Sequence, residues 1–129
     1  MPTYLSDEWL EAAAAAVARS RPLQDVALTP ALVLQQTVRV ADTDAVTWHV
    51  VLGPDGTRWA AGGHPSPDVT FTCDADTAWA VQTGAESAQR AFMAGRLRIG
   101  GDTTALIAHQ GTLADLDDAL AKLRSSTSR

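Results

Sequence analysis

The first pattern in the chain is an apolar stripe at helical spacing. Its members recur at intervals of three and four residues: Trp9, Leu10, Ala13, Ala16 and Val17. This spacing is typical of one buried face of a helix. Ser6 stands just before the stripe, where its side chain can accept hydrogen bonds from the free amides of a first turn. We therefore predict a helix over residues 6–19, followed by a loop over residues 20–30, which contain two prolines.

Residues 31–62 show a different period, with apolar side chains at every second position. The alternation is clear over residues 32–40 and 46–52, and weaker over 58–62. This is the period of half-buried strands. Residues 42–44 form a polar link between the first two strands, and residues 53–56, Gly-Pro-Asp-Gly, are a strong turn signal. The pattern predicts an antiparallel meander of three strands.

The second half of the chain alternates short strands with short helices. Residues 69–73 alternate like a fourth strand, and a helix over 77–83 follows, capped by Asp74 or Asp76. Ser87 begins another helix over 88–94, which Gly95 ends. A fifth strand over residues 96–99 then places Leu97 and Ile99 on one face and the arginines on the other.

Two more helices are predicted near the end of the chain. Asp102 caps a helix over residues 103–110, and Gly111 stops it. Thr112 with Asp115 resembles a capping box that opens a last helix over 112–124. The apolar stripe of that helix is Leu113, Leu116, Leu120 and Leu123. The length of 129 residues fits one domain.

The charge balance narrows the range of partners. The chain has ten Lys and Arg and 15 Asp and Glu, which gives a net charge of −5. A surface that binds nucleic acid needs to be basic, so nucleic acid is not expected as the main partner.

No apolar run approaches the ~18 residues of a membrane span, and the start lacks the pattern of a signal peptide. Cys73 is the one cysteine, so no intrachain disulfide can form. We expect a cytoplasmic protein without an integral membrane segment.

No group of polar residues predicts a reaction. His49, His64 and His109 do not have the spacing of metal ligands. Nothing near Cys73 supplies an activating charge or an oxyanion hole. Arg96 and Arg98 are interpreted as a solvated face or, alternatively, as contacts for an anionic lipid headgroup. We expect no enzyme activity, no metal and no cofactor.

Three segments resemble the sterol carrier protein family, in particular the domain of sterol carrier protein type two. They are VTFTCDADTAWAVQTG, a strand that leads into an acidic helix cap; SAQRAFMAGRLRIGGD, a helical turn with Phe, small residues and Gly; and TTALIAHQ, a helix with adjacent aliphatic residues. The second is the most specific, and the match covers roughly residues 33–110. The resemblance implies an α+β fold, in which helices cover one face of a five-stranded, mostly antiparallel sheet and an apolar tunnel lies between the layers.

The same resemblance implies a lipid carrier that holds a fatty acid, acyl-CoA, sterol or similar ligand. The alternative is a non-catalytic accessory or scaffold protein of a lipid pathway that uses the fold to contact a protein partner. The pocket is expected within residues 69–110 and the neighbouring strands, although the same side chains could be ordinary core. The candidate lining residues are Trp48, Val50, Phe71, Trp79, Phe92, Met93, Leu97, Ile99, Leu106 and Ile107.

Overall fold

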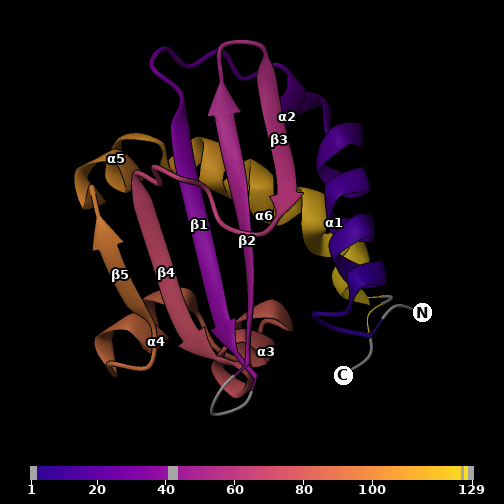
Figure 1. The fold of residues 1–129 in the computed structure, drawn as a ribbon, viewed down its shortest axis with the longest axis vertical. Coiled ribbons are helices and arrows are strands. Elements are labelled where there is room, and N and C mark those ends of the chain that lie inside the picture. The colour runs from indigo at the N-terminus through magenta and orange to yellow at the C-terminus, as the bar shows by residue number, and fades with distance from the viewer. Residues whose placement is uncertain (1–2, 41–43, 126, 128–129) are drawn as a thin grey trace.

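A computed structural model of the chain describes residues 3–40, 44–125 and 127. Its strands are β1 (Leu32–Arg39), β2 (Ala45–Gly53), β3 (Gly56–Ala61), β4 (Val69–Asp74) and β5 (Arg98–Gly101). Its helices are α1 (Asp7–Arg19), α2 (Arg21–Gln24), α3 (Ala75–Gln82), α4 (Ala88–Met93), α5 (Thr103–Ala108) and α6 (Gln110–Ser125). The strands form one sheet in the order β3-β2-β1-β4-β5 (Figure 1). The α+β class and the mostly antiparallel five-stranded sheet are confirmed.

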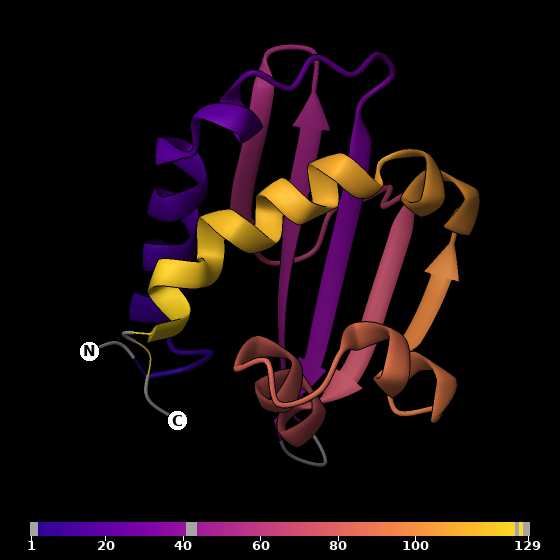
Figure 2. The ribbon, with the colours of Figure 1, turned by 180° about the vertical axis from the view of Figure 1, so that it is seen from behind.

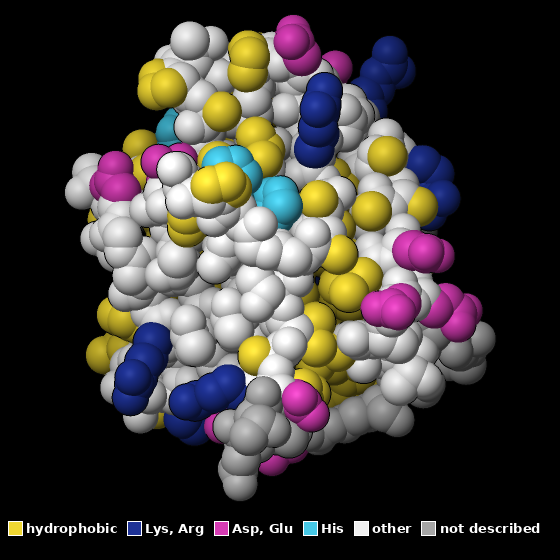
Figure 3. Space-filling model, in the orientation of Figure 1, with side chains coloured by type: hydrophobic (Ala, Val, Ile, Leu, Met, Phe, Trp, Pro, Cys, Tyr) yellow, Lys and Arg dark blue, Asp and Glu magenta, His cyan; other side chains and the backbone are white. Residues whose placement is uncertain are grey.

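The predicted meander is present, with β1, β2 and β3 paired antiparallel in sequence order. The chain then crosses the outer face of the sheet and adds β4 on the far side of β1, in parallel (Figure 1). The backbone amide of His64 donates to the side chain of Gln35 at 2.8 Å, which fastens this crossing segment to the sheet. Figure 3 shows this outer face, where histidine side chains lie near the crossing.

The helices lie at the edge of the sheet and across its other face (Figure 2). α6 runs diagonally across that face. It packs more extensively on α1 and α2 than on any strand, and its first turns meet α5. α6 therefore crosses this face of the sheet and is supported mainly by other helices. No helix in the described part of the chain is long and apolar enough to cross a membrane.

The first helix follows the sequence pattern closely. The side chain of Ser6 accepts a hydrogen bond from the amide of Trp9 at 3.2 Å, and the buried face consists of Trp9, Ala13 and Val17. The predicted loop after it contains α2, which begins at a second cap, Ser20, with a proline in its first turn. Proline suits that position because the first amides of a helix have no partner within the helix.

Two other boundaries differ from the predictions. α6 begins at Gln110, so Gly111 lies in its first turn and Thr112 does not open a new helix. The strand β5 begins two residues later than predicted, because the amides of Arg96 and Leu97 both donate to the carbonyl of Ala91 and extend the turn after α4. Of the predicted link at residues 42–44, only Asp44 is among the described residues.

Candidate functional site

A cavity of about 560 Å³ lies between the sheet and the helices. Its size is within the usual range for sites that hold small organic ligands, ~300–1,000 Å³. Alternate residues of the strands face it because side chains along a strand point to opposite faces. The strand residues that line it include Leu34, Trp48, Val50, Trp59, Phe71, Cys73 and Ile99. This floor is almost entirely apolar.

The roof of the cavity is the apolar stripe of α6. Leu113, Leu116 and Leu120 line the cavity, and each is only half-buried although it lies on the sheet side of the helix. By contrast, Val38, Leu52 and Val69 in the sheet are fully buried. The difference arises because α6 rests mainly on α1, α2 and α5, so its leucines reach the apolar side chains of the sheet only in part and leave a space beside them.

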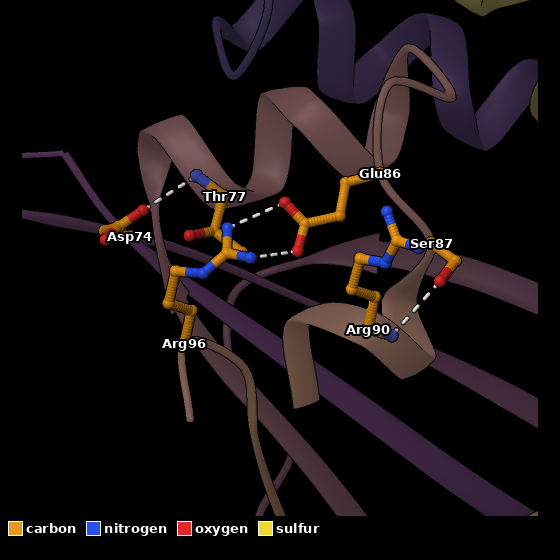
Figure 4. Close-up of polar contacts among 6 residues, drawn as sticks. All are labelled: Asp74, Thr77, Glu86, Ser87, Arg90 and Arg96. Carbon is orange, nitrogen blue, oxygen red and sulfur yellow. Dashed lines mark hydrogen bonds and ion pairs between the residues drawn. The ribbon is translucent and has the colours of Figure 1, made fainter. Parts of the chain in front are cut away.

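The cavity is closed at one end by α3 and α4. Each of these short helices has a side-chain cap: Asp74 accepts from the amide of Thr77 at 2.7 Å, and Ser87 accepts from the amide of Arg90 at 3.1 Å (Figure 4). The loop between the two helices is held by an ion pair between Glu86 and Arg96. These local bonds position Ala78, Val81 and Phe92 against the cavity.

Polar side chains also border the cavity, among them Gln35, Gln36, Thr77, Gln82, Gln89, Gln110, Asp117 and Arg124. Gln36 interrupts the apolar stripe of β1, between Trp48 and Phe71 on the paired strands. At the opposite wall, Arg124 donates to the carboxylate of Asp117 at 2.6 Å. Asp117 and Arg124 lie about two turns apart on the same face of α6, where they border the cavity and are reached by solvent.

Cys73 does not have the properties of a nucleophile. Burial, and next the charge of Asp74, raise the pKa of its thiol above the ordinary value of 9.0, although Gln36 and Arg39 act in the opposite direction. A protonated thiol is a poor nucleophile and a poor metal ligand. The other ionisable side chains of the lining are Tyr4, Asp117 and Arg124. The arrangement can enclose an apolar molecule, and it brings together no nucleophile with a base.

Seven of the ten candidate residues line the cavity. They are Trp48, Val50, Phe71, Phe92, Leu97, Ile99 and Ile107. The other three lie outside the lining. Trp79 packs against the ring of Tyr4, with 5.3 Å between ring centroids. Leu106 packs against a cluster of buried strand residues, Leu32, Leu34, Val50, Leu52 and Val69. Met93 follows Phe92 on α4 and points to solvent, with 77 % of its surface exposed.

Sequence reasoning missed a cluster of aromatic lining residues. Tyr4, Trp9 and Trp59 border the cavity together with Trp48. Trp9 lies 5.4 Å from Trp48 and 6.1 Å from Trp59, measured between ring centroids. Trp9 is part of the recognised face of α1, and the leucines of α6 also formed a recognised stripe. Both were assigned to core, because periodicity shows which face is covered and not whether the covering leaves a space.

The histidines His49 and His64 come together on the outer face of the sheet, away from the cavity. Their rings lie 5.3 Å apart, and Nδ1 of His49 lies 2.8 Å from the carbonyl of Gly62. Among the described residues, no group of three or more His, Cys, Asp or Glu side chains could hold a metal ion.

The model of the SCP-2 sterol transfer family matches residues 11–114. The chain belongs to this family. The match covers both layers that enclose the cavity, from the helix α1 to the first turns of α6. Comparison with curated proteins finds no match.

Solved structures show the same fold at low sequence identity. A conserved hypothetical protein from Thermus thermophilus is 20 % identical, with a TM-score of 0.73 over all of this chain and 93 % of that one. Palmitated SCP2L2 from Aedes aegypti is 22 % identical, with a TM-score of 0.61 over 85 % and 94 % of the two chains. The UbiJ-SCP2 ubiquinone synthesis protein is 17 % identical, with a TM-score of 0.55 over 92 % and 95 %.

The SCP-2 family is in general one of lipid-carrying domains, and the cavity of this chain agrees with that general role. Its enclosing elements are the sheet, the bridging helix α6 and the short helices α3 and α4. These elements position large apolar side chains around open space, which is the arrangement that an apolar ligand requires.

Proposed function

We propose that this SCP-2 domain binds a lipid in the cavity beneath α6 and carries it. One observation supports this most strongly. Leu113, Leu116 and Leu120 of α6 face the sheet and yet are half-buried, so apolar surface lines a space that protein side chains do not fill. A ligand with a hydrocarbon part would cover that surface, and each buried CH2 group would contribute about 0.8 kcal/mol before the costs of association.

A fatty acid or acyl-CoA is the ligand class that the site favours. The lining is apolar along most of the strand residues and at Leu113, Leu116 and Leu120 of α6, and it is charged at Asp117 and Arg124. A single-chain lipid has the same division between tail and head. The structural neighbour from Aedes aegypti is described as palmitated, which supports a fatty acyl ligand for the fold.

The reduced thiol of Cys73 suits a reducing compartment such as the cytoplasm.

Titration with a fluorescent fatty acid tests this proposal. The wild-type protein is expected to bind at micromolar concentration. Phe92→Asp is expected to weaken binding at least tenfold, because it sets an unpaired charge against apolar walls, and a loss of about 1.4 kcal/mol already corresponds to tenfold. Met93→Asp is the matched control, since Met93 is the next residue of α4 but lies outside the lining. Both side chains are substantially exposed, so both variants should fold, which circular dichroism would verify.

The second candidate is an accessory protein of a lipid pathway that binds a protein partner. The UbiJ-SCP2 neighbour, described as a ubiquinone synthesis protein, shows that the fold also occurs in a protein of a biosynthetic route. Native mass spectrometry of the purified protein followed by solvent extraction separates the two candidates. A co-purified lipid supports the carrier. A lipid-free mass, with no binding of fatty acid, acyl-CoA, sterol or phospholipid at micromolar concentration, would reject the carrier in favour of the accessory role.

A further inference from the structure

The turn that follows α4 exposes apolar side chains between two buried anchors. Ala91 and Leu97 are buried, whereas all five residues between them, 92–96, are exposed. Phe92 is 48 % exposed and Met93 is 77 % exposed. We refer to residues 92–96, Phe-Met-Ala-Gly-Arg, as the apolar tip.

The apolar tip has a defined shape. The carbonyl of Ala91 accepts hydrogen bonds from the amides of Arg96 at 3.0 Å and Leu97 at 3.2 Å, which closes the turn at its base. Gly95 has a φ of 78°, a left-handed conformation that glycine adopts without a steric penalty. The backbone of the tip is therefore fixed, with Met93 exposed and Phe92 half-exposed at the edge of the cavity, and little ordering would be needed for the tip to contact a membrane.

Three arginines surround the apolar tip in a chain whose net charge is −5: Arg90, Arg96 and Arg98. Arg96 is neutralised by Glu86, as Figure 4 shows. Within the part of the chain that the structure describes, no ion pair joins Arg90 or Arg98 to an acidic side chain. Exposed apolar groups flanked by free cations match the interface of an anionic bilayer, where apolar side chains enter the acyl boundary and cations meet phosphate groups.

The apolar tip is continuous with the cavity. Phe92 belongs to the tip and also lines the cavity, and Gln89 of the same helix lines it too. A lipid surface in contact with the tip would therefore lie next to the wall of the cavity. A tip of five residues is small compared with the roughly 800 Å² that each partner buries in a stable protein complex, which favours a bilayer over a protein as its occupant.

We propose that the apolar tip docks this protein on anionic phospholipid membranes, so that lipid can exchange with the cavity past Phe92. The inference rests on the proposed lipid-binding function, because exchange requires a ligand site. Docking itself can be measured separately.

Sedimentation with phosphatidylcholine vesicles, with and without phosphatidylserine, tests the docking. The wild-type protein is expected to bind the phosphatidylserine vesicles and to be released by high salt, which screens exposed charges. Met93→Ser is expected to weaken vesicle binding about tenfold through the loss of an inserted side chain. Arg90→Gln is expected to weaken it about fivefold, the effect of one cation near an anionic surface. Arg58→Gln is the matched control for Arg90→Gln, since Arg58 is also exposed but lies on β3, at the opposite edge of the sheet from β5, and outside the cavity lining.

The outcomes separate docking from ligand binding. In solution without vesicles, Met93→Ser should bind a fluorescent fatty acid as tightly as wild type, because Met93 does not line the cavity. Vesicle binding by a wild-type protein that binds no ligand in solution would retain the docking and reject the carrier function. Absence of wild-type vesicle binding, equal binding with and without phosphatidylserine, or wild-type affinity in both Met93→Ser and Arg90→Gln would overturn the docking proposal.

Discussion

Trp48 and Trp59 stack on neighbouring antiparallel strands, with ring centroids 5.5 Å apart and ring planes inclined by 18°. Both side chains project from the cavity-facing side of the sheet. Offset stacking of this kind is a favoured geometry for aromatic pairs and contributes about 0.5–1.5 kcal/mol beyond the burial of area. The stacked pair thus forms a stiff part of the cavity floor, and it places two fluorophores where a ligand would lie.

The tryptophans provide an internal probe of ligand binding. We expect a fatty acid to shift or quench the intrinsic fluorescence of the protein, because Trp9, Trp48 and Trp59 line the cavity and Trp79 does not. Trp48→Phe should lose much of this change, whereas Trp79→Phe should keep it. Fluorescence titration of both variants checks this expectation. A response that survives in Trp48→Phe and disappears in Trp79→Phe would place the ligand near α3 instead.

Two glycines with positive φ should respond differently to alanine. A Cβ on Gly101 would lie 2.2 Å from the carbonyl oxygen of Asp68, whereas a Cβ on Gly95 would meet nothing within 4 Å. Gly95→Ala should lower the free energy of unfolding by about 1 kcal/mol, the cost of a left-handed backbone for a residue with a side chain. Gly101→Ala adds a backbone collision and should cost about 3 kcal/mol or more. Urea denaturation measures both values, and equal costs would contradict the tight packing at Asp68.

The buried thiol should make stability depend on alkaline pH. The folded-state pKa of Cys73 is raised, mainly by burial, so the unfolded chain loses this proton at lower pH than the folded chain does. The contribution of the protonated thiol to the free energy of unfolding is thus fully present below the ordinary thiol pKa of 9.0. It is lost as the pH rises through the folded-state pKa of Cys73. Denaturation on both sides of that value should show a steeper loss for wild type than for Cys73→Ala. Identical pH profiles would indicate that the thiol is not desolvated.

The cap of α3 should contribute measurably to stability. The side chain of Asp74 accepts from the amide of Thr77, and this bond lowers the pKa of the carboxyl below the ordinary value of 3.8. Asp74→Ala should lower the free energy of unfolding by about 1 kcal/mol, and Asp74→Asn should retain most of it, because Asn is also a good cap. The part of this stabilisation that depends on the negative charge of Asp74 is present above the ordinary pKa of the carboxyl. It is lost as the pH falls through the folded-state pKa of Asp74. Denaturation of the three proteins at neutral and acidic pH measures these differences. Equal stability of Ala and Asn variants would show that the cap has little effect.

Local signals predicted most elements because each depends on neighbouring residues. Ser6 and Ser87 begin helices as expected, and of the two candidate caps Asp74 and Asp76 it is Asp74 that begins α3, since a cap satisfies amides only three residues away. The boundary at Thr112 was predicted wrongly because two signals competed there. Gly111 resembles a helix end, and yet it is accommodated in the first turn of α6, where the helix is held by α1, α2 and α5.

The candidate site was predictable only in part, and the misses have one cause. Phe92 and Met93 are adjacent, apolar and on the same short helix, but only Phe92 lines the cavity. Their sequence context is nearly the same, and the direction of each side chain depends on how α4 is seated against the sheet. Trp9 and Trp59 were missed for the same reason, since they lie 50 residues apart and meet only after β3 packs beside α1.

The sequence by itself determined most of the helices, the meander and the apolar faces, because hydrophobic periodicity, caps and turn residues act over a few positions. Only the tertiary structure decided that β4 pairs in parallel with β1 and that α6 rests on helices rather than on the sheet. The apolar stripe of α6 would look the same over a filled core and over a cavity. The difference is the distance between two layers, which depends on the supports at both ends of α6 and is not encoded in the pattern of the stripe.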